Sequence, residues 1–205
     1  NPGSFAYGSF PFYLLWGLGI IWDSYDTYFY VGRLFLGLIG FPLSCVILVF
    51  LSKRVFNDLA PGIIAALFLA GNPFSVQLSR FFTVDPILLL TALFTLAALF
   101  YSLDKPSWIR YSIVGIGFGL SLATKSSALS LLVPIGLGAL IAHKPWKGKR
   151  NLYQSSGAIM VILLVGIVTL FLAAPYQFLD FETFLKHQRE QISMVAGHWI
   201  PPYTV

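Results

Sequence analysis

The chain of 205 residues has a composition that excludes an ordinary water-soluble domain. Hydrophobic residues make up 57% of it and charged residues only 10%, whereas about 25% of the residues of a soluble domain are charged. No water-facing shell can cover so much apolar surface, so most of the chain is expected to lie in lipid. The net charge of +5 does not indicate a nucleic-acid partner, because the basic residues form short clusters between apolar runs.

The first expected element, residues 10–22, is too short to cross a bilayer and is rich in aromatic residues, which favour the headgroup region. Charge-free runs then follow along the chain, and a run of about 20 apolar residues can span the hydrocarbon. The predicted spans are 31–51, 60–79, 86–103, 109–124, 126–142 and 153–174. The fourth and fifth would form one run if Lys125 did not divide them.

The distribution of Lys and Arg decides whether Lys125 marks a turn. With six spans and an outer N-terminus, the cytoplasmic loops hold eight basic residues: Lys53, Arg54, Lys105, Arg110, Lys144, Lys147, Lys149 and Arg150. The outer side holds five: Arg33, Arg80, Lys125, Lys186 and Arg189. A single crossing by 111–142 would remove this asymmetry, so the positive-inside rule favours a hairpin with Lys125 at the outer face.

The last expected element belongs to an outer loop, residues 175–205. Within it, residues 180–196 carry apolar side chains at helical spacing and charged side chains largely on the other side, with Asp180 available as N-cap. This pattern predicts a helix lying on the membrane surface. The predicted fold class is therefore all-α, a polytopic transmembrane helix bundle with interfacial helices on the outer face.

Ionisable residues are absent from the middle of every predicted span, which argues against an ion-coupled transporter. The most informative polar stretch is SRFFTVDP, residues 79–86. Asp85 before Pro86 can be an N-cap, with Arg80 as an interfacial anchor. Equally, this cation and carboxylate could bind an anionic headgroup and a metal or polar acceptor. Lys125 in ATKSS can be a snorkelling lysine or can contact a lipid phosphate.

Several strings, taken in order, resemble the membrane glycosyltransferases of the protein O-mannosyltransferase and aminoarabinose-transferase type. These strings are NPGSFAYGSFPFYLL, VGRLF, NPFSVQLSRFFTVDPILLL, LATKSSALSLL and APYQFLDFETFLKHQREQISMVAGHWIPPYTV. The resemblance implies the GT-C fold class and an enzyme that uses a lipid-phosphate-linked sugar as donor. Such enzymes transfer the sugar from a polyprenyl or dolichyl phosphate to a protein, lipid or glycan acceptor on the non-cytoplasmic face, by a single inverting displacement.

The same resemblance assigns roles to three residues. It implies that Arg80 and Lys125 bind the donor phosphate and that Asp85 is a supporting acidic residue of the catalytic site. The main base lies upstream in this family, and Asp23 and Asp26 come too late to match it. We therefore expect the chain to be part of one transmembrane glycosyltransferase domain, without its first span, catalytic loop and C-terminal remainder, and inactive alone.

The sequence leaves other points open. No recognised metal spacing is present, so the metal ligands are unknown, although a divalent metal as cofactor is not excluded. The expected partners are the bilayer, the lipid-linked donor and the acceptor. The expected location is the cell membrane in a prokaryote or the endoplasmic reticulum in a eukaryote. The alternative to an enzyme is a non-enzymatic, transporter-like or scaffolding subunit whose boundary charges only set its topology.

Overall fold

The computed structural model describes residues 7–20 and 25–197, and within them the chain forms helices and turns without any strand. This confirms the predicted all-α class. The elements are α1 (Phe10–Gly19), α2 (Tyr25–Phe35), η1 (Leu36–Gly40), α3 (Phe41–Phe56), α4 (Ala60–Gly71), α5 (Pro73–Arg80), α6 (Val84–Asp104), α7 (Trp108–Thr124), η2 (Ser126–Leu131), α8 (Leu132–His143), η3 (Pro145–Lys147), α9 (Lys149–Ala173), α10 (Tyr176–Leu179) and α11 (Phe181–Val195).

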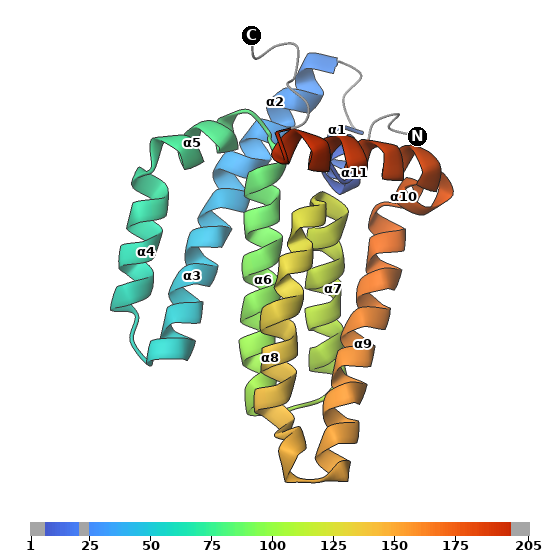
Figure 1. The fold of residues 1–205 in the computed structure, drawn as a ribbon. Coiled ribbons are helices and arrows are strands. Elements are labelled where there is room, and N and C mark those ends of the chain that lie inside the picture. Colours follow the sequence, from blue (N-terminus) through green and yellow to red (C-terminus); the bar gives the residue numbers. More distant parts are fainter. Residues whose placement is uncertain (1–6, 21–24, 198–205) are drawn as a thin grey trace.

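Four helical segments of the described chain are long and apolar enough to cross a membrane: Thr27–Phe56, Val84–Asp104, Ser126–Lys147 and Lys149–Ala173. The bent pair α4 and α5 makes five if it counts as one span. The chain is therefore a multi-pass membrane protein. Helix α7, which covers the predicted span 109–124, runs alongside these segments (Figure 1) but is only 17 residues long. The complete six-span topology stays a prediction.

Helices α6, α7, α8 and α9 pack around a shared apolar core, and α7 makes its most extensive contact with α9. The two helices approach closely because α7 carries Gly115 and Gly119 at the contact. A Cβ atom on Gly119 would lie 2.4 Å from the carbonyl oxygen of Gly166 on α9. Small residues at such spacing allow membrane helices to pack backbone against backbone.

The predicted span 60–79 is not one straight helix. The chain breaks at Asn72, which has extended backbone angles (φ −76°, ψ 114°), and α5 leaves α4 at 64°. Pro73 causes the break, because it has no N–H to donate and it disfavours helical angles at the residue before it. Asn72 Oδ1 then accepts a hydrogen bond from Phe74 N at 2.9 Å and begins the new helix. As a result α5 lies across one end of the bundle (Figure 1).

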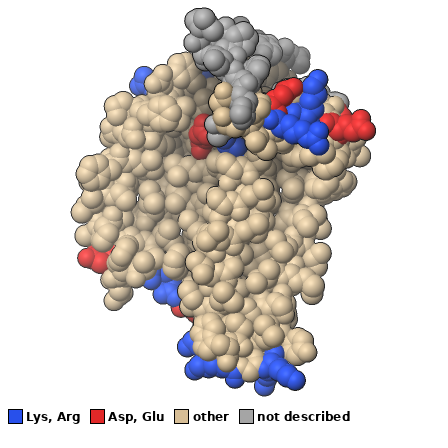
Figure 2. Space-filling model, viewed as in Figure 1, with Lys and Arg blue, Asp and Glu red and all other residues tan. Residues whose placement is uncertain are grey.

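The two ends of the bundle differ in charge. One end, here called the basic end, contains the turns α3–α4, α6–α7 and α8–α9, and Lys and Arg gather there (Figure 2). The opposite end, here called the site end, contains α5, α11 and the turn between α7 and η2 (Figure 1). Lys125 forms that turn, so residues 111–142 make two helices and not one.

Helix α11 lies across the site end, as an interfacial helix would (Figure 1). Ser126 donates a hydrogen bond from Oγ to Gln188 Oε1 at 2.8 Å, which ties α11 to the turn after α7. The rings of Phe181 and Phe184 stack at a centroid distance of 6.2 Å. Asp180 occupies the N-cap position of α11, as predicted, although its side chain makes no capping hydrogen bond there.

Candidate functional site

The structure brings together two of the three predicted site residues. Lys125 Nζ donates a hydrogen bond to Asp85 Oδ1 at 2.8 Å, in an ion pair across 40 positions of sequence. The side chains are 32% and 45% exposed, so the pair is open to a ligand. The ring of Tyr7 lies 5.5 Å from Lys125 Nζ, and Gly8 N donates to Thr124 O at 2.9 Å. The segment before α1 is thereby attached to the lysine turn.

Asp85 does not cap α6, contrary to the interpretation of Asp85–Pro86 as a helix start. Phe82 adopts a left-handed conformation (φ 50°), and α6 then begins at Val84 with Thr83 at the N-cap position. Asp85 thus lies in the first turn, where a carboxylate interacts favourably with the helix dipole. Its side chain is free of the capping role and available to Lys125.

Arg80 lies apart from this pair, in a groove of about 380 Å³ between α2, η1 and α5. It is exposed as the last residue of α5. Arg33 of α2 lines the same groove, together with polar residues and apolar ones: Tyr30, Leu34, Gly37, Phe41, Val76 and Ser79. We call this the two-arginine groove. A smaller groove of about 160 Å³ contains Asp85 and shares Phe41 and Ser79 with it, so the two halves of the site adjoin.

The SRFFTVDP segment holds Arg33 and Arg80 together by packing against α2. The guanidinium of Arg33 lies 5.8 Å from the centre of the Phe81 ring. Gly32 faces Phe82, since a Cβ atom on Gly32 would lie 2.7 Å from that ring. Two successive phenylalanines thereby fix the end of α5 against the start of the long helical segment. Sequence reasoning treated Arg33 only as a topology residue, although VGRLF was among the strings of the resemblance.

The groove is electropositive. Among the side chains that the structure describes, neither Arg33 nor Arg80 has a carboxylate within 4.0 Å, and the ion pairs found involve other residues. Two guanidiniums on one groove repel each other, and an anion between them removes that repulsion. A phosphate fits this arrangement, because guanidinium forks bind its oxygens in pairs.

The described residues contain no group of three or more His, Cys, Asp or Glu side chains that could hold a metal ion. Asp23 and His198 lie outside the described residues, as does the side chain of Asp26.

On α1, burial raises the pKa of the Tyr13 phenol, so this hydroxyl stays neutral at physiological pH. Among the described residues that line the two grooves, the charged ones are Arg33, Arg80 and Asp85.

Comparison with known proteins places the chain in a family. No curated protein and no solved structure matches the chain significantly. A family profile, described as dolichyl-phosphate-mannose-protein mannosyltransferase, matches residues 11–176. The match includes α2, α5, the start of α6 and the turn at Lys125. Since it spans most of the chain, the protein belongs to the dolichyl-phosphate-mannose-protein mannosyltransferase family.

Proposed function

We propose that this protein is part of an enzyme that transfers a sugar from a polyprenyl or dolichyl phosphate to an acceptor on the non-cytoplasmic face. The observation that carries the proposal is the two-arginine groove beside the Asp85–Lys125 pair, at the end of the bundle opposite the basic end. A phosphate at a lipid boundary is the ligand that such a groove suits best. The acceptor is a protein, lipid or glycan.

The two arginines of the groove stabilise the lipid phosphate as it leaves the sugar. In a single displacement the acceptor oxygen bonds to the anomeric carbon, and the bond from that carbon to the phosphate oxygen breaks. The phosphate leaves with the bonding electrons, and its negative charge grows. Arg80 and Arg33 stabilise that charge from the groove, where the low dielectric strengthens the interaction. The base that takes the acceptor's proton is not assigned to any residue of this chain.

Lys125 and Asp85 have a second, linked role. Asp85 fixes the ammonium of Lys125 at the rim of the site, where it can exchange its carboxylate partner for a phosphate oxygen. Between turnovers, when no phosphate is bound, the carboxylate of Asp85 holds the lysine side chain in place. We assign no metal ligand to the described residues.

The rival function is a membrane subunit without catalytic activity. It accounts for the boundary charges through topology alone, but not for two arginines from separate helices on one groove. The two hypotheses differ in their consequences for Arg80→Lys. Lysine preserves the charge and can still snorkel, so a topology residue tolerates the change.

The test is sugar transfer by the full-length protein, with a synthetic lipid-phosphate sugar as donor and matched expression of each variant. Arg80→Lys is expected to lower kcat/KM by about ten- to a hundredfold, because lysine cannot restore the paired hydrogen bonds of the guanidinium. Arg33→Lys is expected to act in the same direction. Arg189→Lys on α11 is the matched control, since Arg189 is exposed and lies outside the two-arginine groove. Wild-type activity of Arg80→Lys and Arg33→Lys would refute the assignment of the groove.

A further inference from the structure

A second polar pocket lies at the basic end, and the proposed transfer reaction does not use it. It has a volume of about 410 Å³ and lies between the start of α7, the end of α8 and the first turns of α9. Trp108, Tyr111, His143 and Gln154 provide its aromatic and polar walls. Tyr111 Oη lies 2.6 Å from His143 Nε2, which places a hydrogen-bonded phenol and imidazole in the lining.

The geometry of the aromatic wall is defined by helix packing. The Trp108 ring meets the Tyr111 ring edge-on, with centroids 6.4 Å apart. The indole also lies over Gly157 of α9, where an added Cβ atom would come within 3.2 Å of it. Glycine at this position leaves room for the tryptophan, so the wall of the pocket joins α7 to α9.

Four cations follow the His143 of the pocket along the chain. Lys144 and Lys147 lie in the turn after α8, and Lys149 and Arg150 open α9. All four are exposed. Lys144 directly follows His143, and its left-handed backbone (φ 48°) turns the chain at this point. Arg150 precedes Gln154 by four residues, so the two share one face of α9 and Arg150 lies one turn further out.

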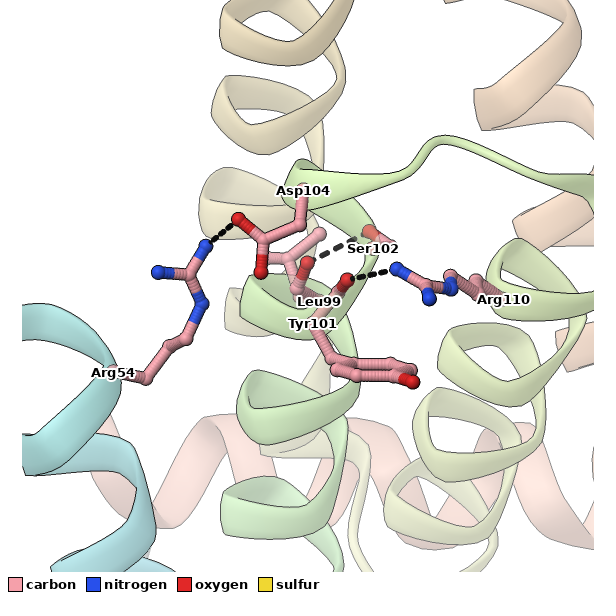
Figure 3. Close-up of polar contacts among 6 residues, drawn as sticks. All are labelled: Arg54, Leu99, Tyr101, Ser102, Asp104 and Arg110. Carbon is pink, nitrogen blue, oxygen red and sulfur yellow. Dashed lines mark hydrogen bonds and ion pairs between the residues drawn. The ribbon is translucent and has the colours of Figure 1, made fainter.

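Few acidic residues lie at this end of the bundle. Only two occur there in the sequence, Asp58 and Asp104. Asp104 pairs with Arg54 of α3, and Arg110 donates to Tyr101 O at 2.8 Å (Figure 3). Asp58 Oδ1 accepts from Ala60 N. Among the side chains that the structure describes, none of these four cations has a carboxylate within 4.0 Å.

The exposed aromatic side chains indicate the depth of the pocket in the membrane. Trp108, Trp146 and Tyr153 are 61%, 68% and 74% exposed. Exposed Trp and Tyr are typical of the headgroup level of a bilayer. The positive-inside rule explains four cations in a cytoplasmic turn, but it does not explain a polar, aromatic-walled pocket directly beside them.

We propose that this pocket binds the headgroup of an anionic phospholipid from the leaflet at the basic end. Its phosphate lies at the mouth of the pocket against Arg150 and Lys144, and its hydroxyl groups meet Tyr111, His143 and Gln154. Basic pockets between membrane helices bind anionic headgroups in this manner. A choline headgroup binds less well, because its cation would face the same cluster of basic residues.

Native mass spectrometry of the purified full-length protein, with equal amounts of phosphatidylglycerol and phosphatidylcholine, tests the proposal. We expect preferential retention of phosphatidylglycerol. Arg150→Gln should weaken it about fivefold, the effect of one basic residue near an anionic surface. Lys53→Gln removes the same charge at the same end, but from α3 and away from the pocket, and should leave retention unchanged. Equal effects of the two substitutions would overturn the proposal.

Tyr111→Phe provides a second measurement that does not depend on surface charge. It keeps the ring and removes the hydroxyl that is hydrogen-bonded to His143, so a modest loss of stability is expected. Retention of phosphatidylglycerol is therefore compared under conditions where thermal unfolding shows the variant to be folded, and it should be lower than in the wild type. Unchanged retention in Tyr111→Phe, or displacement of the lipid by excess inorganic phosphate, would each count against a lipid headgroup in this pocket. Sugar transfer is assayed separately, because Arg80 lies at the opposite end and its variants test a different site.

Discussion

At the scale of single residues, the ion pair between Asp85 and Lys125 makes a specific prediction about coupling. Lys125→Met and Asp85→Asn should each lower sugar transfer, since each removes one half of the arrangement that presents the ammonium. The double variant should be no worse than the more damaging single one, because the partner left behind has already lost its function. Kinetics of the four proteins in a double-mutant cycle measure this, and fully additive losses would show that the residues act independently.

The same pair should contribute little to stability. Both side chains are more than 30% exposed, and ion pairs open to solvent contribute about 0.2–1 kcal/mol to the free energy of unfolding. Loss of activity in these variants is therefore not expected to come from unfolding. Thermal unfolding of each purified variant serves as the control.

The sequence predicts only some of the residues of the site. Arg80, Asp85 and Lys125 came from the family resemblance, and the structure pairs two of them. Arg33 could not be associated with Arg80 from the sequence, because they share a groove only where α5 bends back toward α2. The signal for that bend was present in Asn72–Pro73, a dipeptide that marks turns, but a search for charge-free runs does not register it.

At the scale of elements, the contact between α7 and α9 predicts that Gly119 tolerates no side chain. Gly119→Ala would place a Cβ atom 2.4 Å from a backbone oxygen of α9, which cannot move without separating the helices. A destabilisation of about 1–3 kcal/mol is expected from such overpacking. Gly136→Ala on α8 is the matched control, because nothing lies within 4 Å of its added Cβ atom.

Unfolding of the purified protein in mixed micelles by sodium dodecyl sulfate provides the measurement. Gly136→Ala should be neutral or slightly stabilising, since alanine favours a helix by up to about 1 kcal/mol over glycine. If Gly119→Ala and Gly136→Ala unfold alike, the close packing of α7 on α9 is wrong. The comparison is independent of activity and of any bound lipid.

Apolar runs predicted the helices better than they predicted where helices start and bend. Composition alone predicts a helix for a run such as 86–103, because the lipid leaves the backbone no other way to satisfy its hydrogen bonds. The N-terminus of α6 depended instead on the left-handed Phe82, which lets the helix begin at Val84. Phe82 also packs against Gly32, a contact between segments 50 positions apart that local sequence does not show.

At the scale of the whole molecule, charge divides the bundle into two ends with different roles. The middle of the bundle is uncharged on the face seen in Figure 2, and the charged groups gather toward the ends. One end carries the two-arginine groove and the Asp85–Lys125 pair, and the other carries the basic turns. A protein that handles a lipid-linked sugar on one face needs this separation, since the cations of the basic end keep the site end on the other side.

This division predicts the orientation of the chain in the membrane. The turns at Ser127 and at Lys149 lie at opposite ends of the bundle (Figure 1), and both residues are exposed. In the full-length protein with its native cysteines replaced, including Cys45→Ser, a membrane-impermeant maleimide should label Ser127→Cys from the non-cytoplasmic side. Lys149→Cys should react only after the membrane is permeabilised, because eight of the 13 basic residues mark that end as cytoplasmic. Labelling of both variants from one side would place Lys125 and the basic turn on the same face, and the assignment of the sugar-transfer site to the outer surface would fail with it.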